Sequence, residues 1–229
     1  MKIKKVFFVI LILIISVCLS GCSKEAPEKL NSKTTKELGY LEELVFQIVL
    51  KLQKNDYITD ENLLDWDKIL VDAEKINMEL DNIMLDLSNL KLANEKIGNL
   101  SNCTNRVLVA VNSKNEQALI GELNNLYQLI PQYLEDYETD KNEKSKKQLK
   151  AMVLNSFNYS LNGDWETAKN EVINAENKYN DMIGDNEYIQ KNSYSINKIY
   201  ILIQEYKTAI NSENFELVRL KFIALCSEI

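Results

Sequence analysis

The sequence lacks histidine and has few of the residues that interrupt helices, with 6 glycines and 2 prolines among 229 residues. Histidine is the commonest general base, metal ligand and pH switch, so its absence makes many kinds of catalytic centre improbable. Glycine and proline are the usual helix breakers, and their scarcity predicts helices throughout. The chain also lacks a phosphate-binding loop, an HExxH sequence, a CxxC pair and a nucleophile elbow. We therefore predict a protein that is not an enzyme and needs no cofactor.

Positive charge is scarce as well, since 27 basic residues stand against 34 acidic ones. The first 21 residues hold three lysines and no acid, so the rest of the chain carries 24 basic and 34 acidic residues, a net charge of −10. This balance argues against nucleic acid as a partner and against broad docking on anionic lipid. Two acidic clusters, residues 60–67 and 135–140, lack the alternating ligands and central glycine of a calcium loop. We predict no metal site.

Residues 1–21 have the features of a secretory signal, because Lys2, Lys4 and Lys5 precede an almost wholly apolar run over residues 6–19. The run is shorter than the roughly 20 residues that cross a bilayer comfortably. It ends in Leu19-Ser20-Gly21-Cys22, which resembles the lipobox of bacterial lipoproteins.

In lipoproteins the cysteine thiol receives a diacylglyceryl group, and a dedicated peptidase cleaves before it. The resemblance implies that Leu19, Ser20 and Gly21 form the recognition signal and that the mature chain begins at a lipidated Cys22. The implied location is the extracytoplasmic face of a bacterial cell membrane, held by acyl chains. An uncleaved signal anchor with an incidental cysteine is the alternative.

Residues 22–34 are polar and have no apolar period, so we expect a flexible tether that holds the folded part just off the membrane. The many Asn, Lys and Ile residues suggest an AT-rich genome and therefore a Gram-positive source.

Apolar residues at the helical period predict a helix from about Thr35 to Lys54. From Trp66 to Val111 the apolar positions alternate by three and four, which indicates either one long helix or a hairpin. A further helix is predicted on Leu119, Leu123, Leu126 and Ile130, which Pro131 follows. The heavily charged Asp136–Lys147 is typical of a solvated linker.

Turn residues give further boundaries. Asp60 is a candidate N-cap, and Ser113 and Glu116 have capping-box spacing. Asn162-Gly163-Asp164 predicts a tight turn, and Gly184 a helix C-cap.

The chain also resembles itself at an offset of 99 residues. Asp65-Trp66 falls on Asp164-Trp165, residues 110–115 fall on 209–214, and the apolar seam transfers with them. The first helix matches residues 149–157 at an offset of 108. Because turn residues match as well as apolar ones, we predict an internal duplication. The expected fold is all-α, with two tandem up-down helical bundle units at 35–138 and 139–229. By symmetry, the break at Gly184 favours a hairpin near Ser88.

The second unit contains Gly163-Asp164-Trp165-Glu166-x-Ala168, then an Ile-rich helix and Ala209-Ile210-Asn211-Ser212-Glu213-Asn214. This pattern resembles a family of small membrane-tethered helical proteins of clostridia and their relatives, whose function is uncharacterised. The resemblance covers about Leu149 to Ile229. The histidine and acid pair of that family's central break is replaced here by Gly184-Asp185-Asn186-Glu187.

Tyrosine is abundant, with 11 residues. Tyr188, Tyr194, Tyr200 and Tyr206 are spaced by six, and an aromatic patch of this kind could bind a partner. Alternatively, these rings line the bundle and place their hydroxyls at its rim. Trp66 and Trp165 occupy equivalent positions and are expected to be core anchors.

Two cysteines, Cys103 and Cys226, remain in the body of the chain. Each lies among apolar residues of a helical pattern, so we expect two buried free thiols. A disulfide between them is the alternative, which an extracytoplasmic location permits.

The sequence thus predicts a lipid-anchored, non-catalytic binding or protein-interaction module at the cell envelope, with an envelope protein as its partner. The alternative is a lipid-tethered enzyme that acts on cell-wall glycans through paired carboxylates. The solute receptor of a transporter is a third candidate, but it would need strands that the sequence does not predict.

Overall fold

The computed structural model describes residues 32–61, 63–89, 94–134, 141–184 and 186–229. These residues form an all-α structure, as predicted, in which Ile58 and Leu64 make one isolated bridge and the described segments contain no strand. The helices are α2 (Ser32–Gln53), α3 (Trp66–Asn89), α4 (Asn94–Asn112), α5 (Glu116–Leu134), α6 (Lys141–Leu161), α7 (Trp165–Ile183), α8 (Asn186–Asn211) and α9 (Phe215–Cys226). The leader, the lipobox at Leu19–Cys22 and most of the tether lie outside the described residues.

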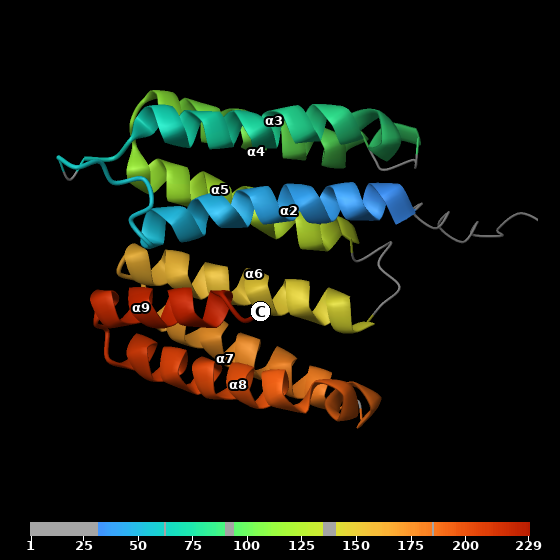
Figure 1. Ribbon diagram of the computed structural model, residues 1–229, viewed down its shortest axis with the longest axis vertical. Helices are drawn as coiled ribbons and strands as arrows, with labels where there is room; N and C mark the ends of the chain where they lie inside the picture. The colour runs from blue at the N-terminus through green and yellow to red at the C-terminus, as the bar shows by residue number, and fades with distance from the viewer. Residues whose placement is uncertain (1–31, 62, 90–93, 135–140, 185) are drawn as a thin grey trace, which may run out of the picture.

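The helices lie roughly parallel or antiparallel and are stacked along the longest axis of the molecule (Figure 1). Each helix packs against the next, α2 also packs against α5, and α6 against α9. We call α2–α5 the first helix group and α6–α9 the second. The groups meet where α5 packs on α6 and α2 touches α9, so α3 and α4 lie at one end of the stack and α7 and α8 at the other.

The buried apolar side chains of both groups form one continuous cluster. The seam predicted from Trp66 onward supplies Ile69, Ala73, Ile76 and Leu80, each at most 1% exposed. Trp66 and Trp165 are half-buried and pack against this cluster. This core crosses the boundary between the groups and marks no division into two domains. The two independent domains therefore stay a prediction.

The question of one helix or two is answered for residues 66–112, because α3 and α4 are distinct helices that pack against each other. The chain reverses direction between them (Figure 1). The preference for a hairpin is therefore correct.

Four helix starts are fixed by side-chain caps. Asp65 accepts a hydrogen bond from the Lys68 amide at 3.0 Å, and the same arrangement recurs at Asn115, Asp164 and Asn214. The predicted caps Asp60 and Ser113 are wrong. Ser113 donates its hydroxyl to the Ala110 carbonyl instead, because α5 begins at Glu116 and its cap is Asn115, two residues after Ser113.

The tight turn at Gly163 is present, with a φ of 76°, and Gly184 is the C-cap of α7. Helix α2 starts at Ser32, earlier than expected, so the last residues assigned to the tether are helical. Helix α5 continues through Pro131 to Leu134. Buried Ile130 and Tyr133 hold this last turn against the core despite the missing amide.

The charged segment expected to be a linker is helical from Lys141 onward. For residues 141–147 the linker prediction is wrong, because Lys147, near the start of α6, pairs with the buried Glu42 of α2. Residues 136–140 lie outside the described residues. A lysine that looks solvated in the sequence here joins two helices.

Helix boundaries repeat with the predicted offset. Helices α3 and α7 begin 99 residues apart, α4 and α8 end 99 residues apart, and α5 and α9 begin 99 residues apart. Backbone φ is positive at Lys114 and Glu213, also 99 apart, and at Asn55 and Gly163, 108 apart. These are correspondences of geometry. The duplication that would explain them stays a prediction.

Candidate binding surfaces

The four tyrosines predicted as a patch do not share one face. Tyr194 is 81% exposed and Tyr200 44% exposed, whereas Tyr206 is buried. A step of six residues turns an α-helix by about 240°, so successive members of the series point in different directions. Tyr206 therefore belongs to the core, as the alternative interpretation had it, and the prediction of one four-membered patch is wrong. The side chain of Tyr188 lies outside the described residues.

Tyr200 instead lines a groove between α8 and α9, with a volume of about 330 Å³. Its other lining residues are Ile201, Gln204, Glu205, Thr208, Leu217 and Lys221. Ile201 is 57% exposed, and Leu220 on α9 is 58% exposed. We call this feature the α8/α9 groove. The sequence pattern missed Ile201 and Leu217 because single apolar residues beside a buried seam carry no periodic signal.

Ion pairs hold the helices that form the α8/α9 groove. Lys221 of α9 pairs with Glu205 of α8 at 2.8 Å, which joins the two walls. On the other side of α8, the Glu176 carboxylate of α7 accepts hydrogen bonds from Gln204 at 2.7 Å and Lys207 at 2.5 Å. These bonds lower the pKa of Glu176. The groove therefore has a fixed frame and an apolar interior.

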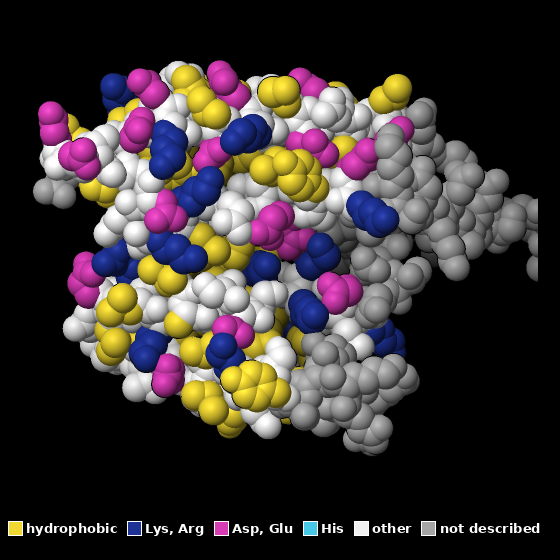
Figure 2. All heavy atoms as spheres, viewed as in Figure 1, with side chains coloured by type: hydrophobic (Ala, Val, Ile, Leu, Met, Phe, Trp, Pro, Cys, Tyr) yellow, Lys and Arg dark blue, Asp and Glu magenta, His cyan; other side chains and the backbone are white. Residues whose placement is uncertain are grey.

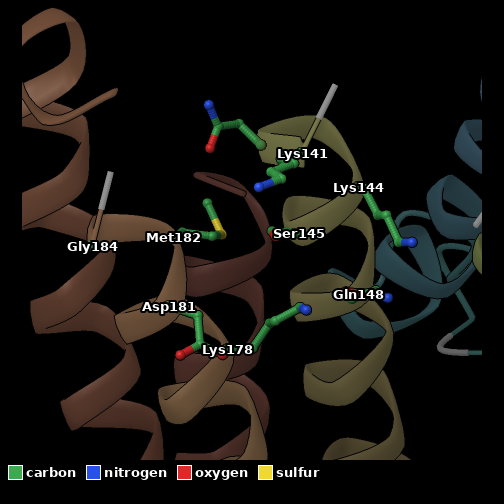
Figure 3. A pocket seen from close by; sticks show the side chains of 9 residues that line it. Lys141, Lys144, Ser145, Gln148, Lys178, Asp181, Met182 and Gly184 are labelled. Atoms are coloured by element: carbon green, nitrogen blue, oxygen red, sulfur yellow. The ribbon is translucent and has the colours of Figure 1, made fainter. Parts of the chain in front are cut away.

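A larger pocket of about 660 Å³ lies between α6 and α7. Lys141 and Lys144 line it from α6, and Lys178 and Asp181 from α7. In Figure 3 the side chains of Lys141 and Lys178 extend from opposite helices into the space between them. Three lysines could hold an anionic group. However, the Asp181 carboxylate lines the same pocket, and its negative charge opposes anion binding. We assign no ligand to this pocket.

A buried polar cluster joins the two helix groups. Glu42 of α2 is 5% exposed, and its carboxylate accepts hydrogen bonds from Tyr127 of α5, at 2.6 Å, and from Lys147 of α6. Burial, and then the nearby Glu42 charge, raise the pKa of the Tyr127 hydroxyl well above its usual value, so the hydroxyl remains a donor. The cluster is a structural joint, because each of its polar groups is already bonded.

Cys103 and Cys226 are free and buried, as expected. Burial raises the pKa of both thiols, most strongly at Cys226. A protonated, buried thiol is a poor nucleophile and a poor metal ligand.

Among the described residues, no group of three or more acidic or cysteine side chains could hold a metal ion. The acidic residues between 60 and 67, which the sequence analysis compared with a calcium loop, are among the residues searched. Within the same residues, none of the helices combines the length and the apolar character needed to cross a membrane.

No family model, no curated protein and no solved structure shows a significant match to this chain.

Proposed function

We propose that this protein is a membrane-anchored, extracytoplasmic lipoprotein that acts as a non-catalytic binding module at the cell envelope. The anchor is supported by the leader and by Leu19-Ser20-Gly21-Cys22, with two acyl chains on Cys22 as the expected attachment. The partner is an envelope protein that presents an apolar segment.

The observation that carries the binding role is the α8/α9 groove. Tyr200, Ile201 and Leu217 offer an aromatic ring and two aliphatic side chains in one concave, partly exposed site. Concave sites with apolar walls and a few polar groups at the edge are typical of binding sites. Tyrosine suits such a site because it buries a large ring while its hydroxyl stays in water.

The positions 99 residues earlier supply a matched control. Ser101 and Asn102 stand where Tyr200 and Ile201 stand in the second group. The substitutions Tyr200→Ser and Ile201→Asn would therefore give the groove the side chains that this fold already carries on α4.

The test is photo-crosslinking in intact cells, with a photoreactive amino acid at position 200 and, as the control, at position 101. We expect one specific envelope protein to be captured from position 200 only, and Ile201→Asn to reduce that capture about ten-fold. Equal labelling from both positions would rule out the groove. The anchor is checked in the same cells, since Cys22→Ala should leave an uncleaved precursor.

The alternative, a lipid-tethered enzyme acting on cell-wall glycans, has less support. Glycoside hydrolysis commonly uses two carboxyl groups that face a cleft. One described pocket has several carboxylates in its lining, those of Glu42, Glu43 and Glu143. Its volume of about 160 Å³ is small for a sugar chain. Glu42 there is already bonded to Tyr127 and Lys147.

A further inference from the structure

Helix α3 carries a row of exposed apolar side chains on the face opposite the core. Val71, Met78 and Leu85 are 53%, 65% and 70% exposed. Seven residues make almost two helical turns, so the three side chains stay within about 40° of one line. From the first to the last the row is about 21 Å long at 1.5 Å per residue. We call these residues the outer α3 row.

The core seam of α3 defines the heptad against which this row is placed. Ile69, Ile76 and Ile83 are buried at one heptad position, and the outer α3 row lies two residues after each of them. This is the position farthest from the helices that pack on α3, where polar residues are the rule. Hydrophobic side chains occur at intervals along the edge of the molecule that α3 forms (Figure 2).

The corresponding helix of the second group shows that the fold does not need apolar residues here. The positions 99 residues later are Asn170, Asn177 and Gly184, all exposed on or next to α7. Both helices occupy the end of the stack in their group and are long and amphipathic. The apolar row is therefore a property of α3 alone and not of the architecture.

Negative charge borders the outer α3 row on one side. Asp67, Glu74 and Asp81 are exposed, recur every seven residues, and form no ion pair with a described residue. Two basic residues, Lys68 and Lys75, lie on the other side of the row, and each already has a partner. The Lys75 ammonium pairs with Asp72 at 2.7 Å, and the Lys68 ammonium donates to the Asp56 carbonyl at 3.0 Å.

We propose that the outer α3 row is a docking surface for an amphipathic helix of a second protein, whose apolar residues cover Val71, Met78 and Leu85 and whose Lys or Arg residues face the acidic border. A helix fits because apolar residues repeating every seven positions are the pattern that one helix presents to another. A basic border fits the charge of Asp67, Glu74 and Asp81. A second copy of this chain is a poorer occupant, because two chains of net charge −10 repel each other.

This surface goes beyond the proposed function, since it lies at the opposite end of the stack from α8 (Figure 1). A protein with both surfaces could hold two partners at once. The inference does not depend on the lipid anchor or on the α8/α9 groove.

The test uses the chain from Cys22 onward with Cys22→Ser, which contains every described helix. The probe is a synthetic amphipathic helix of about 21 residues with leucines in its seam and lysines on its borders, and a second peptide has glutamates at the lysine positions. We expect the lysine-bordered peptide to bind and the glutamate-bordered one not to bind. Binding is measured by fluorescence anisotropy at two salt concentrations.

Val71→Asn together with Met78→Asn should weaken binding of the lysine-bordered peptide at least ten-fold, although these changes leave every charge in place. The matched control, Asn170→Val together with Asn177→Met, should not change it. Binding that survives Val71→Asn and Met78→Asn, or equal binding of both peptides, would overturn the proposal. So would a concentration-dependent dimer in sedimentation that these substitutions abolish, because a second copy would then be the occupant.

Discussion

In the first helix group Arg106 of α4 pairs with Glu122 of α5 at 2.8 Å, and in the second Glu205 of α8 pairs with Lys221 of α9 at the same distance. Each residue stands 99 positions from its counterpart, and the charges are reversed. The contact between the two helices is thus the same while its chemistry is exchanged. We infer that packing fixes how the helices of the two groups are arranged, whereas the residues on their surfaces can differ.

The surfaces do differ, because each group has exposed apolar residues where the other has polar ones. The first group has apolar residues on the outside of α3 where the second has Asn170 and Asn177. The second has Tyr200 and Ile201 in its groove where the first has Ser101 and Asn102. If the groups share one frame, the apolar sites that are specific to each group are the places to look for function.

The largest expected effect comes from weakening the continuous core in one helix group at a time. Phe222 of the second group stacks on Phe157 with ring centroids 4.1 Å apart, and Leu123 is its counterpart in the first group. Phe222→Ala should lower the free energy of unfolding by about 4 kcal/mol, and Leu123→Ala by about 3 kcal/mol.

Urea unfolding followed by tryptophan fluorescence measures both effects, since Trp66 reports on the first group and Trp165 on the second. Single-tryptophan variants, Trp66→Phe or Trp165→Phe, assign each signal. If the continuous core makes one cooperative body, both probes shift together in both variants. Separate transitions would instead establish two independent units.

A smaller effect is expected from a carboxylate that the two groups place in opposite environments. Burial disfavours ionisation of Asp72, but hydrogen bonds from Lys51, Lys75 and Tyr57 outweigh it and lower the pKa of Asp72 to about 2. At the equivalent position, burial raises the pKa of Glu171 in spite of hydrogen bonds from Asn155 and Asn174.

Because the pKa of Asp72 is lowered on folding, its contribution is present above pH 4 and is lost as the pH falls toward 2. Asp72→Asn should therefore destabilise the protein by about 1–2 kcal/mol at pH 7 and have little effect at pH 2. Glu171→Gln should stabilise it at pH 7, and this gain should vanish as the pH falls below the usual glutamate pKa. Unfolding midpoints between pH 2 and pH 7 measure both, and equal profiles for the two variants would contradict the comparison.

The smallest expected effect comes from the exchanged ion pair. Arg106→Glu places two carboxylates together and should cost about 0.5 kcal/mol, because the pair is exposed to solvent. Adding Glu122→Lys should restore the loss, since it recreates the polarity found at Glu205 and Lys221. Thermal unfolding at low and high salt is the measurement. If Arg106→Glu alone is neutral at low salt, the pair does not stabilise the first group.

The periodicity of apolar residues was sufficient to predict the helices and most of their core, because burial repeats at the helical period in Ile69, Ile76 and Leu80. It could not place caps and ends. Asp65 rather than Asp60 begins α3, and α5 continues through Pro131, because packing at Ile130 and Tyr133 decides where that helix stops.

Contacts between distant segments were also beyond the sequence. The joint of Glu42, Tyr127 and Lys147 ties α2 to α5 and α6, which follow it by 85 and 105 residues at these contacts, and nothing local marks any of the three residues. The tyrosine series failed for a simpler reason. A spacing of six looks regular in the sequence but does not keep side chains on one face of a helix, as buried Tyr206 and exposed Tyr200 show.

Each group has an even number of helices, so the chain returns to the side on which it entered. The turns before α3, α5, α7 and α9 consequently all lie at the end of the molecule away from the start of α2 (Figure 1). On a lipid-anchored chain these four turns would form the end of the molecule that points away from the membrane. An epitope tag inserted at Lys114 or Glu213, where the backbone already makes a left-handed turn, would then be displayed outward and could be stained on living cells.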